Sequence, residues 1–240
     1  MKSIVKLFAA ACVLTTICNA ALAQSQSREE IYKTLESRRA EFKVLEEQLL
    51  ATSEEDRAAY AEFLSQPDTG LIRLLPRETY DGKIVTIRGS GAYYSFTRLT
   101  HEYGQGSDLS LEQKYIKVGF AGADYGLMTS LGDVPLDSVT ADHEKALIAS
   151  RLKVPGELPQ ARIEQQRFGA GTIIEGTSFK DRLPAKVNST YILRSINYER
   201  TDVLVAFRII RQDMDGSLVI VWKFLGKYPK PQLARSAGDQ

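Results

Sequence analysis

The chain has 240 residues, of which 43% are hydrophobic and 25% are charged, and its 31 lysines and arginines nearly balance its 30 aspartates and glutamates. This length suits one or two domains. Near-neutrality argues against general binding to nucleic acid or to an anionic membrane, so we expect no nucleic acid as a partner.

Residues 1–23 predict a cleavable secretory signal peptide. Lys2 and Lys6 precede an apolar stretch over residues 7–17, and Ala21-Leu22-Ala23 offers the small residues that signal peptidase needs before Gln24. The stretch is shorter than the ~20 residues that span a bilayer, and no later segment is long enough, so no integral membrane span is expected. The short lysine-containing start is typical of bacteria, and we expect a periplasmic or secreted protein.

Both cysteines, Cys12 and Cys18, lie inside this signal. The residues before them match a lipid-attachment site poorly, but a lipoprotein and an uncleaved anchor remain alternatives to cleavage. The mature chain would contain no cysteine, and therefore neither a disulfide nor a thiolate metal site. An oxidising compartment permits disulfides without requiring them.

Residues 24–70 predict a helical arm, with 11 acidic and 6 basic side chains against 19 and 23 in residues 71–240. A helix is expected over residues 27–50. Thr52 and Glu55 form a capping-box pattern, so a second helix should run to about Ser65 before the turn-forming residues 66–70. One face of the first helix is apolar except at Arg38, through Ile31, Leu35, Phe42, Leu45 and Leu49.

This apolar stripe has two possible partners. It could pack against the protein's own β domain, as a helical hairpin or arm, or it could bind a partner or a second copy and form a homo-oligomer. The prediction common to both is that the stripe is buried, because burying one such side chain stabilises by ~1.5–3 kcal/mol.

Residues 71–228 predict an antiparallel β-rich domain. Runs of β-branched and aromatic residues between Gly, Asp and Ser breakers indicate the strands: Ile84–Arg88, Ala92–Leu99, Lys114–Ala121, Gly171–Glu175, Thr190–Ile196, Val203–Arg211 and Leu218–Leu225. Asp215-Gly216 predicts a hairpin between the last two runs.

One helix interrupts these strands, capped by Thr140 and ending near Pro155-Gly156. Residues 229–240 are expected to form a loose tail. The predicted class is therefore α+β: an N-terminal helical arm or hairpin, then an antiparallel β-sheet or partly open barrel with one inserted helix.

Few residue patterns in the chain indicate chemistry. The two histidines, His101 and His143, are too few for a histidine-rich zinc site, and the chain has neither an H-E-x-x-H nor a G-x-S-x-G motif. Ser90 lies in a Gly-Ser-Gly turn. The glycine-dense segments match no phosphate-binding pattern, and Gly there suits bulges and tight turns. We expect no metal, no cofactor and no catalytic residue.

A carboxylate pair is the remaining catalytic option. Asp124 and Asp133 flank a predicted loop over residues 125–132, and nearby tyrosines could stack on a sugar ring. Carbohydrate hydrolysis needs two such groups at a fixed separation. The alternative function is therefore an extracytoplasmic hydrolase acting on carbohydrate or ester, although loop aspartates commonly form turns.

The candidate ligand-binding residues are three basic side chains on the last strands: Arg194, Arg208 and Lys223. Each lies within an apolar stripe of its strand, so all three should line one sheet face. A two-residue turn at Asp215-Gly216 would place Arg208 opposite Lys223, where like charges destabilise unless they share an anion.

That anion could be Glu175 or a bound ligand, and the alternative is a solvated face with long stems lying over apolar neighbours. The sequence thus favours an exported, non-catalytic envelope or secreted protein that binds an envelope partner or a small, possibly anionic, ligand.

Overall fold

A computed structural model describes residues 27–78, 91–104, 106–120 and 122–234. The predicted signal peptide over residues 1–23 and the predicted strand Ile84–Arg88 lie outside these ranges. The chain divides into two compact units, residues 1–48 and residues 49–240. The α+β class is confirmed, because an N-terminal helix precedes antiparallel sheets, and the described strands do not close into a barrel.

Helix α2 spans Arg28–Leu50 and confirms the first predicted helix. The Ser27 amide donates to the Glu30 carboxylate and the Glu30 amide donates to Ser27 Oγ, which is a capping box. No residue of α2 is buried within the single chain, so burial of the apolar stripe against a partner stays a prediction. Three of its side chains have exposed fractions of 42%, 47% and 62%: Ile31, Leu35 and Leu45.

The second predicted helix is two short helices, α3 (Glu54–Ala59) and α4 (Ala61–Leu64), separated at Tyr60. Ser53, not Thr52, caps α3, and its Oγ accepts from the Asp56 amide. Phe63 is buried in the core of the second unit, so these helices belong to the β domain rather than to α2.

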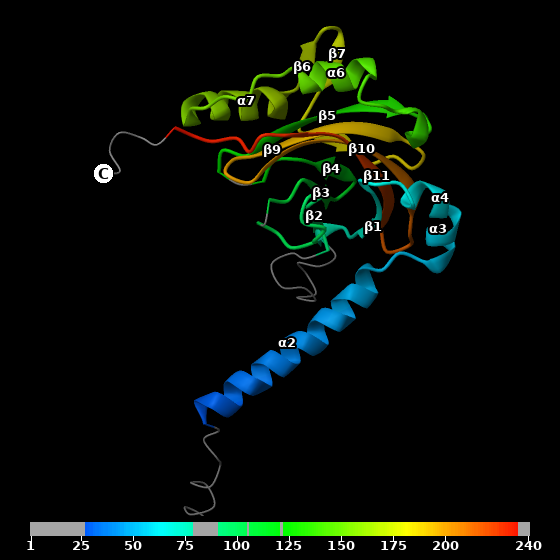
Figure 1. The fold of residues 1–240 in the computed structure, drawn as a ribbon, viewed down its shortest axis with the longest axis vertical. Coiled ribbons are helices and arrows are strands. Elements are labelled where there is room, and N and C mark those ends of the chain that lie inside the picture. Colours follow the sequence, from blue (N-terminus) through cyan, green and yellow to red (C-terminus); the bar gives the residue numbers. More distant parts are fainter. Residues whose placement is uncertain (1–26, 79–90, 105, 121, 235–240) are drawn as a thin grey trace, which may run out of the picture. The chain divides into compact units, whose positions relative to one another are not determined.

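A five-stranded antiparallel sheet forms the centre of the second unit, in the order β1-β11-β10-β9-β5 (Figure 1). Three of its strands were predicted: β9 (Thr190–Asn197), β10 (Thr201–Gln212) and β11 (Leu218–Tyr228). The other two were not: β1 (Thr69–Leu74) begins inside the predicted breaker segment, and β5 (Tyr125–Gly132) replaces the predicted loop.

A second sheet has the order β2-β3-β4-β8, and β6 pairs with β7 as a separate hairpin. The strands of these two sheets are short: β2 (Tyr93–Tyr94), β3 (Leu109–Glu112), β4 (Tyr115–Lys117), β8 (Arg182–Pro184), β6 (Thr172–Ile174) and β7 (Thr177–Phe179). Lys180, between β7 and β8, exchanges backbone hydrogen bonds with Met128 of β5 at 2.7 and 3.0 Å. This bridge ties the edge of the central sheet to the second sheet.

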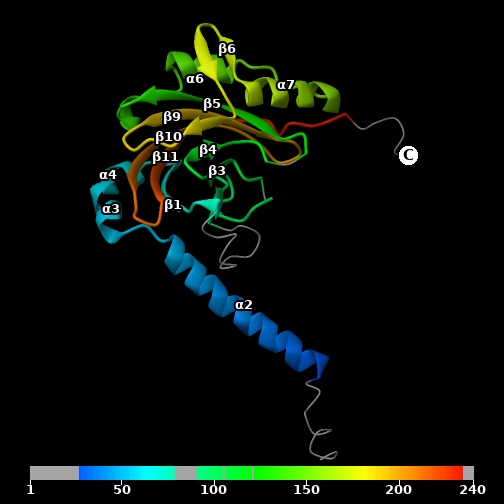
Figure 2. The same cartoon turned by 180° about the vertical axis from the view of Figure 1, so that it is seen from behind.

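Both faces of the central sheet are buried, which explains why its strands are apolar on both faces. One face packs on the second sheet, where Val205 and Phe207 belong to the same core as Phe96 and Leu111. The other face packs on helices, where Leu204 and Ala206 belong to the same core as residues of α6 and α7. The two views of the ribbon show these three layers (Figures 1 and 2).

Two α-helices cover the sheet, which corrects the prediction of one inserted helix. Helix α6 (Glu144–Ser150) is capped by His143, whose Nδ1 accepts from the Lys145 amide. It follows the short 3-10 helix η2 (Leu136–Ser138). Helix α7 (Leu158–Ala170) has Pro at its start, and Gly171 ends it with φ 88°.

Part of the predicted loose tail is attached to the body. The Glu199 amide donates to the Pro231 carbonyl, the Ala234 amide donates to the Gly156 carbonyl, and Leu233 packs against the helix-facing core. Residues 235–240 lie outside the described ranges. None of the helices in the described part of the chain has both the length and the apolarity that crossing a membrane requires.

Candidate functional site

The three predicted ligand-binding side chains share one sheet face. Leu204 pairs with Arg194, Ala206 with Lys223 and Arg208 with Val221, so all three basic residues lie on the helix-facing side. The expected pairing of Arg208 with Lys223 is wrong. The turn spans Asp213–Ser217 instead of two residues, and a bulge near Ile210 shifts the register by one more.

Arg194 is locked in an internal network. Its Nε and one terminal nitrogen each donate to the Asp202 carboxylate at 2.9 Å, and both side chains are almost fully buried. The other terminal nitrogen donates to three carbonyls at the end of α6, those of Ala149, Ser150 and Leu152. Arg194 therefore closes a helix C-terminus, which favours positive charge.

Arg208 and Lys223 also have separate internal partners. Arg208 donates to Asp133 at 2.6 Å and to the Val134 carbonyl at 3.0 Å. Lys223 donates to the Asp137 carbonyl at 3.2 Å, and burial lowers the pKa of its ammonium group. The three side chains thus hold α6 and the loop before it on the sheet, and they do not converge on one site.

Glu175 is not their counter-charge. It lies exposed at the tip of the β6–β7 hairpin with φ 48°, and Asp202 and Asp133 pair with the arginines instead. The predicted strand Gly171–Glu175 therefore ends before Glu175. This residue has a positive φ and lies in the turn between β6 and β7.

The groups considered for hydrolysis are also apart. Asp124 and Asp133 flank the eight-residue strand β5, which at ~3.3 Å per residue separates them by about 25–30 Å. A glycosidase pair is roughly 5–10 Å apart. His101 Nε2 lies 2.9 Å from the Arg73 carbonyl, and burial lowers the pKa of its ring to about 4.

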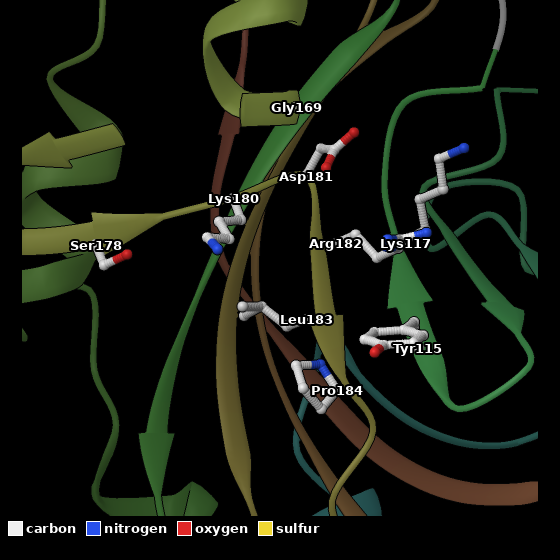
Figure 3. A pocket seen from close by; sticks show the side chains of 9 residues that line it. All are labelled: Tyr115, Lys117, Gly169, Ser178, Lys180, Asp181, Arg182, Leu183 and Pro184. Atoms are coloured by element: carbon white, nitrogen blue, oxygen red, sulfur yellow. The ribbon is translucent and has the colours of Figure 1, made fainter. Parts of the chain in front are cut away.

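An open groove of ≈ 700 Å³ lies where β4, β8 and the end of α7 meet. Figure 3 shows Lys117 entering from β4 on one side, and Lys180, Asp181 and Arg182 from the β7–β8 segment on the other. Its remaining lining residues are Tyr115, Gly169, Ser178, Leu183 and Pro184. The Met128–Lys180 bridge fixes the β7–β8 segment and therefore the position of these charges.

Three cations share this groove, and two of them have no salt bridge within the described ranges. The Arg182 guanidinium lies 4.7 Å from the centre of the Tyr115 ring, a cation–π contact that leaves its N–H donors free for an anion. Lys180 is exposed, and Lys117 is 3.9 Å from Glu112. The groove carries an excess of positive charge over its single lining carboxylate.

Gly171 leaves room for the Lys180 side chain. A Cβ at this glycine would lie 2.7 Å from Lys180 Cε, so the lysine stem crosses the end of α7 where a side chain would block it. Asp181 is held through its backbone, with its amide donating to Phe168 and its carbonyl accepting from Val118. Burial raises the pKa of the Asp181 carboxyl group, while Lys117 and Arg182 oppose that rise.

Sequence reasoning missed this groove. Lys180-Asp181-Arg182 is a run of three charged residues, which is the one local signal. Nothing in the sequence brings that run to Tyr115 and Lys117, because a strand pairing across more than 60 residues does so. Groups of three or more potential metal ligands are absent from the described residues.

Comparisons with known proteins give no family for the chain. No protein-family model, no curated protein and no solved structure matches it. The function of the groove between β4 and β8 is therefore inferred only from the side chains that line it.

Proposed function

We propose that the protein is exported from the cytoplasm, is non-catalytic and binds a small anionic ligand in the groove of Lys117, Lys180 and Arg182. The observation that carries this proposal is that three cations from two chain segments line one groove together with a single carboxylate. The export part rests on the signal-peptide pattern of residues 1–23.

The chemistry of the groove favours carboxylate or phosphate. The guanidinium of Arg182 offers a planar fork that grips either anion through two hydrogen bonds. Lys117 and Lys180 add point charges, and Tyr115 and Ser178 add hydroxyl groups. An anionic group presented by an envelope partner carries the same chemistry as a free small ligand.

The test is calorimetric titration of the protein with citrate, inorganic phosphate and galacturonate, at matched ionic strength. We expect at least one anion to bind, and Arg182→Ala to weaken that binding at least about tenfold, because a hydrogen bond to a charged group contributes roughly 1.5–3 kcal/mol. Lys180→Ala should act in the same direction.

Lys153→Ala is the matched control, because Lys153 is exposed and does not line the groove. It removes one positive charge and should leave the affinity unchanged. Equal losses from Arg182→Ala and Lys153→Ala would mean non-specific attraction and would contradict the proposal, as would the absence of binding by all three anions.

A further inference from the structure

Helix α2 carries an apolar stripe with a heptad pattern. Ile31, Leu35, Phe42, Leu45 and Leu49 follow one another at spacings of four, seven, three and four residues. In a heptad repeat, Leu35, Phe42 and Leu49 occupy a positions, and Ile31 and Leu45 occupy d positions. The d position between them is Arg38, which is the one polar residue in the stripe. The stripe spans 19 residues, just under three heptads.

We propose that α2 pairs with α2 of a second copy in the antiparallel direction, in the register that sets Arg38 beside Phe42. Facing positions then sum to 80, so Ile31 meets Leu49 and Leu35 meets Leu45. Every apolar position of the stripe meets an apolar side chain or the Arg38 stem. The one charged seam residue lies against an aromatic ring, whose face attracts a guanidinium.

The charges along α2 select this direction. Residues 28–39 carry four basic and three acidic side chains, whereas residues 40–50 carry one and three. Antiparallel pairing sets the net +1 half on the net −2 half, and it opposes the two helix dipoles. Parallel pairing stacks the two −2 halves and places Arg38 on Arg38 inside the seam.

Flanking positions agree with the same choice. In a parallel pair, Glu41 of one helix would approach Glu46 of the other, which is a repulsive contact. In the antiparallel register, Arg39 approaches Glu46. The two Glu41 side chains also come near each other there, but each lies 2.9 Å from Arg38 of its own helix, which supplies the opposite charge.

The first experiment measures mass in solution by light scattering, on the chain that begins at Gln24. We expect a dimer, and we expect Leu45→Asp to yield a monomer whose body melts at the wild-type temperature. Val44→Asp is the control, since Val44 is exposed but lies outside the stripe. A wild-type chain that is monomeric at its highest soluble concentration would overturn the proposal, as would a Leu45→Asp dimer.

The second experiment tests direction by cysteine crosslinking, which is clean because residues 24–240 contain no other cysteine. Glu41→Cys lies near the two-fold axis of the antiparallel pair and should form a disulfide with its own copy. Leu35→Cys should not, and neither should the outward-facing control Ala40→Cys. Self-crosslinking of Leu35→Cys without that of Glu41→Cys would show a parallel pair and overturn the proposal.

Discussion

Two buried ionisable residues in the described part of the chain, Arg194 and Asp108, have different kinds of partner. Arg194 has both an ion pair with Asp202 and three carbonyl acceptors. Asp108 is fully buried and has neutral donors, including the Phe96 amide and the Asn197 amide group, each at 2.9 Å. The first arrangement favours a charged pair. At Asp108, burial favours the neutral acid, although the hydrogen-bond donors around it favour the carboxylate.

Asp202→Ala should destabilise the protein strongly. It leaves the Arg194 guanidinium buried without its counter-charge, and breaking a buried pair in this way costs about 3–5 kcal/mol. The measurement is the free energy of unfolding in denaturant. Lys227→Ala serves as the control, because it breaks a half-exposed pair with Asp68, and such pairs contribute about 0–1 kcal/mol. Equal losses for the two variants would refute the assignment.

Asp108 should make stability depend on pH. Burial raises the pKa of its carboxyl group to about 7 from 3.8. Because the folded state binds this proton more tightly, the stabilising contribution is complete below about pH 4 and is lost as the pH rises through 7. Asp108→Asn, which cannot ionise, should therefore gain stability relative to wild type between pH 4.5 and pH 8, by on the order of 2–4 kcal/mol.

His101 has the opposite dependence over part of this range. Burial lowers the pKa of its ring, so its contribution is lost as the pH falls through about 4. This residue is present in both proteins, and its effect cancels in the difference between their unfolding free energies. A difference that stays constant from pH 4.5 to pH 8 would show that Asp108 is not buried as an acid.

At the scale of the elements, β5 shows how packing overrides local sequence. Its residues include two glycines and few β-branched side chains, and it forms the edge of the central sheet beside β9. Gly126 is required by a close approach: a Cβ there would lie 2.6 Å from the Arg194 carbonyl oxygen and would overlap the Val118 side chain. Glycine thus permits the strand at this point.

Gly126→Ala should cost about 1–3 kcal/mol, the usual range for overpacking a tight core, because backbone on the neighbouring strand cannot move aside freely. The control is Gly156→Ala, where the added methyl group meets nothing within 4 Å and φ is not positive. Thermal melts of both variants make the comparison. A Gly126→Ala protein that melts with wild type would mean that β5 does not pack against Val118.

At the scale of the whole molecule, one sheet is buried on both faces, by helices on one side and by the second sheet on the other (Figure 2). The Lys117–Lys180–Arg182 groove lies where the second sheet joins the edge of the first. A ligand bound in this groove would therefore contact the junction between the two sheets.

Export is the prediction that belongs to the whole chain. In the native host, N-terminal sequencing of the protein should begin at Gln24. Ala23→Lys should retain residues 1–23, because signal peptidase requires a small residue before the cut. An intact Met1 on a membrane-bound wild-type protein would contradict cleavage.

The sequence by itself determined helix α2, the three long strands β9, β10 and β11, and the α+β class. These elements are long and carry periodic patterns, so local preference and final structure agree. The sequence also predicted that Arg194, Arg208 and Lys223 share one face. This held although the predicted register was wrong, because Arg208 pairs with Val221 instead of Lys223, and a shift of two residues leaves the face unchanged.

Tertiary structure decided the rest. A bulge and a five-residue turn set the β10–β11 register, which separated Arg208 from Lys223. The short strand β8 pairs with β4 across more than 60 residues. That pairing also created the groove, because residues far apart in the chain become neighbours only when long-range hydrogen bonds and core burial outweigh the entropy of closing the loop between them.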